Sequence, residues 1–252
     1  MCELFGASAA QPIGLGRWIV PFRKRGGGSA DNPDGWGVAS WTSRRLRIEK
    51  APEPGATSAR FGRLASTMRS ELVIAHVRKA RHPPTPGMLN THPFAHACCG
   101  REWVFAHNGL VPEIIGRGAR VALCEPRGET DSEHAFCQLL GEIAECYEGS
   151  HEREWMQRIA GRAGSIAALG RFNFLLSDGT FLIAYGHDQL HYLEHPAGRD
   201  CLSLVATRPL SANGWQRFSK GELRIYRGGQ LVMRLKTGAA RSRGASVGAA
   251  AG

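Results

Sequence analysis

Residues 172–193 read FNFLLSDGTFLIAYGHDQLHYL, and this stretch indicates the fold more strongly than any other part of the chain. It contains three short runs rich in aromatic and branched apolar residues, a composition typical of β-strands, at 172–176, 180–186 and 189–193. Asp178 and Gly179 separate the first two runs, and this dipeptide is a strong signal for a tight hairpin turn. The stretch therefore predicts consecutive short strands joined by turns.

Similar runs extend this pattern toward both ends of the chain. They predict strands at 36–41, 45–49, 72–77, 102–106, 202–206, 223–226 and 230–234. Helical periodicity is clearest at 131–147, and further helices are expected around 151–168 and near 56–69. Strands in hairpins at both ends, with helices gathered in the middle, predict an α+β fold with antiparallel sheets.

The length of 252 residues and the 42% hydrophobic content suit one globular domain, which we expect at 2–235. The remaining tail, 236–252, has one Val as its only larger apolar residue. It is expected to be disordered because it cannot bury enough surface to offset the entropy lost on ordering. Residues 24–35 are rich in glycine and turn formers and predict a long flexible loop before a strand.

Charge and cysteine content narrow the class of protein. The net charge of +10 would attract anionic ligands, but the basic residues are dispersed without interleaved aromatics, so nucleic-acid binding is not expected. We expect no membrane segment and no signal peptide, and hence a cytoplasmic protein. The seven irregularly spaced cysteines predict reduced thiols rather than a disulfide framework.

Cys2 is a candidate nucleophile. Removal of Met1, which is usual before a small second residue, would give Cys2 a free α-amine beside its thiol. The amine has a pKa of roughly 7.7–8.0 and can act as the base for the thiol near neutral pH, without a catalytic histidine. The pair is therefore a possible activated nucleophile.

Asn108 and Gly109 are candidates for stabilising an oxyanion. They follow a predicted strand and offer a side-chain amide and a backbone N–H. Taken alone, an Asn-Gly pair is more often a simple turn.

Arg78 and Asp131 are candidates for binding an amino-acid substrate. Arg78 ends an apolar run, and its guanidinium could hold a carboxylate, whereas Asp131 could hold an ammonium group. Thr130 and Glu133 also fit the N-cap and third helical position of a capping box, so Asp131 is expected at a helix N-terminus as well.

The order of six short blocks gives a specific resemblance. The blocks are MCELFG at 1–6, DGWG at 34–37, HVR at 76–78, NTHPF at 90–94, HNG at 107–109 and TDSE at 130–133. In this order and approximate spacing, the chain resembles the class II glutamine amidotransferase domain, most closely its short stand-alone branch. ATRPL at 206–210 resembles a further block near the C-terminal end of that domain.

This resemblance implies a four-layer αββα sandwich of two antiparallel sheets between helical layers, the N-terminal-nucleophile hydrolase fold. It implies Cys2 as nucleophile, Asn108 and Gly109 as the oxyanion hole, and Arg78 and Asp131 as clamps for the α-carboxylate and α-ammonium of glutamine. The implied reaction releases ammonia through a γ-glutamyl thioester, with no metal or organic cofactor. An acceptor of the ammonia would be a separate synthase subunit.

One departure from the family pattern leaves the substrate open. Relatives often have Thr or Ser shortly after the arginine, where this chain has Arg81. The extra charge could suit a γ-glutamyl conjugate with a further carboxylate, as in ergothioneine synthesis. A non-catalytic glutamine-binding module is a third alternative.

A zinc site is the main competing interpretation from another class. His92, His96, Cys98 and Cys99 lie close together in the sequence and are all possible ligands. Their spacing does not follow the paired pattern of structural zinc sites, so we do not expect a metal there.

Overall fold

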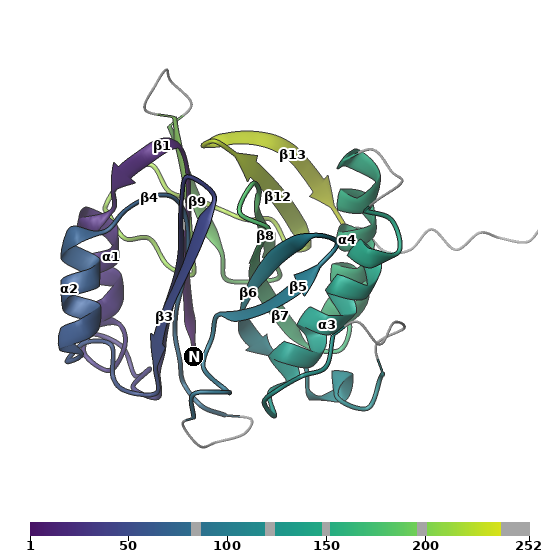
Figure 1. The fold of residues 1–252 in the computed structure, drawn as a ribbon, viewed down its shortest axis with the longest axis horizontal. Helices are drawn as coiled ribbons and strands as arrows, with labels where there is room; N and C mark the ends of the chain where they lie inside the picture. Colours follow the sequence, from purple (N-terminus) through teal and green to yellow (C-terminus); the bar gives the residue numbers. More distant parts are fainter. Residues whose placement is uncertain (82–86, 119–123, 148–151, 196–200, 238–252) are drawn as a thin grey trace, which may run out of the picture.

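Two antiparallel β-sheets stack face to face, and helices cover the outer face of each (Figure 1). The computed structural model describes residues 1–81, 87–118, 124–147, 152–195 and 201–237. The expected α+β fold with four αββα layers is confirmed. Among the described residues, no helix has the length and apolar character needed to span a membrane.

The seven-stranded sheet has the order β11-β9-β10-β1-β4-β2-β3. Its strands are β1 (Glu3–Gly14), β2 (Trp36–Thr42), β3 (Arg45–Ala51), β4 (Arg69–Val77), β9 (His191–His195), β10 (Leu202–Ala206) and β11 (Gln216–Arg217). β1 lies at its centre and pairs with β10 and β4, with Glu3 opposite Val77. This register brings the N-terminus beside the residue that follows β4, Arg78.

The six-stranded sheet has the order β13-β12-β8-β7-β6-β5. Its strands are β5 (Phe94–Cys98), β6 (Arg101–Leu110), β7 (Arg171–Ser177), β8 (Leu182–Gly186), β12 (Glu222–Arg227) and β13 (Gln230–Lys236). The turn at Asp178 and Gly179 joins β7 to β8 as predicted, and Gly179 has a φ of 83°. The third run of the opening stretch forms β9 and crosses to the other sheet.

The buried apolar residues form three cores, two under the helices and one between the sheets. α1 (Gly16–Lys24) and α2 (Ala59–Thr67) cover the seven-stranded sheet, whereas α3 (Asp131–Ala144) and α4 (Glu152–Ala167) cover the six-stranded one (Figure 1). A third core lies between the two sheets. A short 3-10 helix, η1 (Pro112–Ile114), follows β6.

Each strand and helix predicted from the sequence is present, most with shifted ends and β10 with the predicted bounds, but some elements were not foreseen. β1 is the most important, because its sequence ELFGASAAQPIG is dominated by small residues instead of β-branched ones. The small residues suit a central strand, since a Cβ at Gly6 would lie 3.0 Å from the side chain of Leu175. α1 contains Pro21 and starts at Gly16, both of which argue against a helix, and β5 and β11 were also missed.

The two segments expected to be flexible differ in the structure. Residues 25–35 form a loop, and backbone bonds such as Gly28 N to Lys24 O (3.0 Å) hold it against the end of α1. Most of the expected tail falls at 238–252, outside the described residues. Within the described part, Lys236 ends β13 and the Thr237 amide donates to Gly221 O at 2.8 Å.

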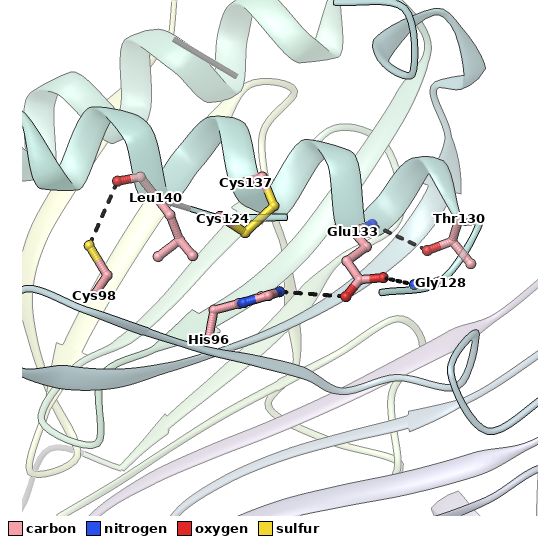
Figure 2. Close-up of a disulfide and its surroundings, with 8 residues drawn as sticks. All are labelled: His96, Cys98, Cys124, Gly128, Thr130, Glu133, Cys137 and Leu140. Carbon is pink, nitrogen blue, oxygen red and sulfur yellow. Dashed lines mark hydrogen bonds and ion pairs between the residues drawn. A yellow bond between two sulfur atoms is a disulfide. The ribbon is translucent and has the colours of Figure 1, made fainter. Parts of the chain in front are cut away.

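The prediction of reduced thiols is wrong for one pair of cysteines. Cys124 and Cys137 form a disulfide between the segment before α3 and the second turn of that helix (Figure 2). The chain folds back along α3 and brings the two Cα atoms to 5.2 Å, within the range that a disulfide spans. Cys2, Cys99 and Cys201 are free thiols, as expected.

Candidate active site

A pocket of about 230 Å³ lies where the start of β1, the ends of β4 and β6 and the N-terminus of α3 meet. Its lining includes all five residues singled out from the sequence, namely Cys2, Arg78, Asn108, Gly109 and Asp131. They come from segments spread over 130 positions of the chain, and the packing of the two sheets brings them together.

Cys2 is half-buried at the entrance to β1, opposite the chain that leaves β4. Its sulfur accepts a hydrogen bond from the Lys79 amide at 3.3 Å, and the thiol lies 3.5 Å from the Lys79 carbonyl. Burial raises the pKa of the Cys2 thiol, whereas the Lys79 amide and the Arg78 charge act to lower it. The thiol is therefore protonated near neutral pH and needs a base to react.

Asn108 and Gly109 lie near the end of β6, with Asn108 buried. The Asn108 side-chain amide donates to Thr207 Oγ1 at 3.4 Å, and the Asn108 backbone carbonyl accepts from Asn173 Nδ2 at 3.1 Å. Because the amide nitrogen carries two hydrogens, one can still be donated to a ligand. Gly109 has no room for a side chain, since a Cβ would overlap the carbonyl oxygen of Arg171.

Thr207 ties β1, the strand that follows Cys2, to this region. Its hydroxyl accepts from the Leu4 amide at 2.8 Å, and its own amide donates to Leu4 O at 3.0 Å. The same hydroxyl receives the Asn108 bond, so one side chain links β1, β6 and the end of β10. Thr207 thereby fixes the separation between Cys2 and Asn108.

Arg78 is buried directly after β4. Its amide donates to Gly35 O at 2.8 Å, and the Asp34 amide donates to Arg78 O at 3.0 Å. The Asp34 carboxylate accepts from the Ala80 amide at 2.8 Å. The loop that contains Asp34 and Gly35 thus clamps the backbone on both sides of Arg78, which contributes to the pocket lining.

Asp131 is the first residue of α3, and only 3% of it is exposed. Its Oδ2 accepts from the Val111 amide at 2.6 Å, which ties the helix to the end of β6. Thr130 caps the helix as predicted, because its hydroxyl accepts from the Glu133 amide at 3.2 Å. The Glu133 carboxylate, however, accepts from the Gly128 amide at 2.7 Å (Figure 2), so the expected return bond of a capping box goes two residues further back.

A buried polar chain runs beside Asp131. The carbonyl of Arg171 lies 3.2 Å from His107 Nε2, and since a carbonyl only accepts, the proton of the neutral ring is on Nε2. His107 Nδ1 then accepts from the Ser132 hydroxyl at 2.8 Å, and this hydroxyl also lies 3.3 Å from Asp131 Oδ1. Burial lowers the pKa of His107, and the nearby Asp131 acts against this shift.

Two further buried histidines lie under the pocket. The rings of His76 and His92 are 4.2 Å apart, and His76 Nε2 donates to His107 O at 3.2 Å. Burial lowers the pKa of His76 to about 3 and holds that of His92 well below its usual value. Both rings are neutral near pH 7, so the positive charge at the pocket comes from arginine and lysine.

Additional cations surround the mouth of the pocket. Arg81 and Arg171 contribute to its lining, and Arg171 Nε forms an ion pair with Asp188 at 2.7 Å. Arg171 also contacts the sulfur of Met1, which contributes to the lining of the pocket next to Cys2.

Several residues of this site were not assigned a role from the sequence. His92, His107, Ser132 and Thr207 fall inside the quoted blocks, so the signal was present without a function attached to it. Asn173 lies outside every block. Its Oδ1 accepts from the amides of residues 187–189, and its Nδ2 donates to Asp188 Oδ1 at 2.8 Å and to the Asn108 backbone carbonyl, so it ties that turn to the pocket residue Asn108.

The alternative zinc ligands do not gather at one point. His92 packs against His76 and Phe94, with ring centroids 4.2 and 4.4 Å away. His96 instead faces Glu133, with 3.5 Å between Nε2 and Oε1. Within the described ranges, the ligand group that contains His96 is completed by Cys124 and Cys137, and not by His92, Cys98 or Cys99.

Comparison with known proteins links this geometry to a family. A family model described as class-II glutamine amidotransferases matches residues 1–202. The Escherichia coli (strain K12) protein named "Putative glutamine amidotransferase YafJ" is 32% identical, over 92% of this chain and 100% of the relative. A Methanocaldococcus jannaschii protein, MJ1515, is also 32% identical, over 92% of this chain and 71% of its own length.

Solved structures agree with the fold. The 2.0 Å crystal structure of a Pseudomonas aeruginosa protein described as a predicted glutamine amidotransferase superposes with a TM-score of 0.69. It is 28% identical and covers 92% of this chain and 100% of that one. The phosphoribosylpyrophosphate amidotransferase of B. subtilis shares the fold, with a TM-score of 0.64 at 16% identity over 93% of this chain and 49% of that one.

Proposed function

Because this chain belongs to the class-II glutamine amidotransferase family, we propose that it hydrolyses the side-chain amide of glutamine through the thiol of Cys2 and releases ammonia. The observation that carries the proposal is the gathering of a thiol, an amide donor, a buried guanidinium and a buried carboxylate around one pocket. Glutamine presents the matching groups, which are a carboxamide to be attacked, an α-carboxylate and an α-ammonium.

The nucleophile in this proposal is Cys2 after removal of Met1. Removal frees the α-amine to take the proton of the thiol, and it takes away the Met1 part of the pocket lining beside Cys2. Burial raises the pKa of the thiol, so this base is needed for attack near neutral pH. His107 is committed to Ser132 and to the Arg171 carbonyl, and burial holds the pKa of His92 well below its usual value, so neither pocket histidine is a good substitute for this base.

The oxyanion is stabilised by the Asn108 amide and the Gly109 backbone N–H. Thr207 and Asn173 hold Asn108 from both sides, so the donor is oriented before the substrate arrives. A donor that is already oriented needs no reorganisation as charge develops in the transition state.

The two ends of the substrate are held by opposite charges. Arg78 pairs with the α-carboxylate and Asp131 with the α-ammonium, each through charge-assisted hydrogen bonds. Asp131 is suited to this role because the Val111 amide fixes one oxygen at 2.6 Å. The buried position of Arg78 strengthens its pairing, since water screens a buried charge less than an exposed one.

The cycle balances without a metal or an organic cofactor. The thiolate adds to the amide carbon, and the tetrahedral intermediate collapses to a thioester as ammonia leaves with the proton from the α-amine. Water then adds to the thioester, and the carbon–sulfur bond breaks to give glutamate and the thiol. Any acceptor of the ammonia lies on a separate synthase subunit, and we place the reaction in the cytoplasm.

A second substrate class is favoured by Arg81 and Arg171 at the mouth of the pocket. A γ-glutamyl compound with a further anionic group would place that group near these cations. The γ-glutamyl-hercynylcysteine sulfoxide hydrolase of Mycobacterium tuberculosis is 31% identical, but over only 84 residues, 33% of this chain and 34% of that protein. Glutamine therefore remains the first candidate, and a glutamine-binding module without activity is the alternative to both enzymes.

The test is the amount of ammonia and glutamate formed from glutamine by protein whose N-terminus has been identified as Cys2 by mass spectrometry. We expect equal amounts of both products, none above background from Cys2→Ala, and normal activity from the matched control Cys99→Ser, another free and partly exposed thiol. Undiminished activity of Cys2→Ala would contradict the mechanism. Faster turnover of a γ-glutamyl conjugate than of glutamine would favour the second substrate class.

A further inference from the structure

Three potential metal ligands converge beneath α3, on the side of the helix that faces β5. In the part of the chain that the structure describes, one ligand atom from each of His96, Cys124 and Cys137 lies within 4.8 Å of the others. Figure 2 shows the His96 ring next to the disulfide, with Nε2 directed at Glu133. We propose that His96, Cys124 and Cys137 bind one zinc ion when the disulfide is reduced.

The ligand set favours zinc. Two thiolates and one imidazole form a soft set of the kind that structural zinc sites use, and oxygen-preferring ions such as Mg²⁺ or Ca²⁺ are disfavoured. Both cysteines are at least 93% buried, at 7% and 2% exposure, so a bound ion would be shielded from bulk solvent and competing ligands, with one water in its fourth position. The Cα separation of 5.2 Å leaves room for the sulfurs to part to the roughly 3.8 Å that a tetrahedral zinc requires.

An independent observation concerns the histidine. The side chain of His96 is only 10% exposed, and its buried Nε2 makes no hydrogen bond. The nearest acceptor recorded for it is Glu133 Oε1 at 3.5 Å, beyond ordinary hydrogen-bond length. Nε2 is thus directed at Glu133 without a full hydrogen bond, and a buried imidazole whose ring also lies beside two sulfurs is suited to a ligand role.

Glu133 supplies the second shell of the proposed site. Its carboxylate is 3% exposed and is held by the Gly128 amide at 2.7 Å. Metal-ligating histidines usually donate their other ring N–H to such a carboxylate, which orients the ring and raises its basicity. This leaves Nδ1 of His96 for the metal and tightens the contact between Nε2 and Glu133.

The chemistry requires a reductant, which in a reducing compartment is a dithiol protein or a small thiol. The reductant gives two electrons and two protons, so the sulfur–sulfur bond breaks to give two thiols and the reductant becomes a disulfide. Zinc then binds as both thiols lose their protons. Oxidation reverses the process and expels the ion, so the oxidised and metal-bound forms exclude each other.

The experiment compares metal binding by the reduced and oxidised forms of the whole chain. Protein reduced with a phosphine and freed of reductant would be titrated with Co²⁺ as the spectroscopic probe and then with Zn²⁺ against a chromophoric chelator. We expect one equivalent of metal, a thiolate-to-cobalt charge-transfer band, and no binding after reoxidation. Failure of the folded, fully reduced protein to bind either ion would overturn the proposal.

Variants identify the ligands. Cys137→Ser and His96→Ala are expected to lose stoichiometric binding, whereas Cys99→Ser should retain it as the matched control. Glu133→Gln should weaken the affinity about 10–100-fold. Retained binding in Cys137→Ser, or loss in Cys99→Ser, would assign the ion to other residues and refute the site. Circular dichroism checks that each variant is folded, and the oxidised wild-type chain gives the same test without any substitution.

Discussion

Helix α3 contributes to two polar clusters that differ in what they leave open. At its first turn, Asp131 and Ser132 face a pocket, and the groups around this pocket include a thiol and an amide with hydrogen-bonding capacity to spare. At its second turn, Cys137 faces Cys124 and His96 in a buried cluster. Under the proposed function the first cluster performs chemistry, whereas the second fastens the helix to the preceding segment through the disulfide.

Substitutions in the pocket and in the buried cluster test this division of roles. Changes in the pocket should affect turnover far more than stability, and changes in the buried cluster should do the reverse.

Asn108→Ala should lower kcat on glutamine about 10²–10³-fold, because it removes one oxyanion donor. The fall should appear in kcat and only weakly in KM, since the donor acts mainly in the transition state. Steady-state kinetics measures both. A loss confined to KM would show that Asn108 binds the ground state and does not stabilise the oxyanion.

Acid should destabilise the fold through the buried side chain of His76. Because burial lowers the pKa of His76 to about 3, the unfolded state, with a pKa near 6.5, binds more protons between these values. Stability therefore falls as pH drops below about 6.5, by up to about 1.4 kcal/mol per pH unit for one such group. Urea unfolding at pH 7 and pH 5 measures the fall, which His76→Gln should reduce. An unchanged pH dependence in this variant would show that His76 is not buried as a neutral ring.

Asp131→Asn should raise KM for glutamine about 10–100-fold, since it removes the charge that pairs with the α-ammonium. The asparagine oxygen can still accept from the Val111 amide, so the start of α3 should remain intact. Thermal melting provides this control. Unchanged KM together with lower stability would show that Asp131 stabilises the N-terminus of α3 and does not bind the substrate.

Loss of the disulfide should lower the free energy of unfolding by about 2–4 kcal/mol, because the bond restrains the unfolded chain. Cys124→Ser combined with Cys137→Ser, compared with the oxidised parent in a chelating buffer, measures this effect. Turnover of glutamine should stay within about twofold, since neither sulfur lines the pocket. A large fall in kcat without loss of stability would contradict the division between the two clusters.

The two clusters also differ in how far the sequence predicted them. The pocket residues stand in short blocks whose order is informative, so Cys2, Arg78, Asn108, Gly109 and Asp131 could be named in advance. Asn173 could not, because an isolated buried asparagine between apolar residues has no local signature.

The buried cluster could not be predicted from the sequence either, because its members also lack a local signature. Cys124 and Cys137 are separated by 13 positions in no recognisable spacing, and only the path of the chain along α3 joins them. His96 drew attention through its neighbours Cys98 and Cys99, which proved to be the wrong partners. The strand β1 was missed because small residues have low strand propensity, and pairing on both edges overrides that preference.

The proposed mechanism requires Cys2 to become the first residue and to use its own α-amine as base. The direct measurement compares ammonia release by the processed protein with release by a variant in which one alanine is inserted between Met1 and Cys2. The insertion keeps the thiol but leaves the Cys2 nitrogen in a peptide bond, so we predict that activity falls to background in a folded protein. Equal activity of the two proteins would show that another group activates the thiol and would contradict the mechanism.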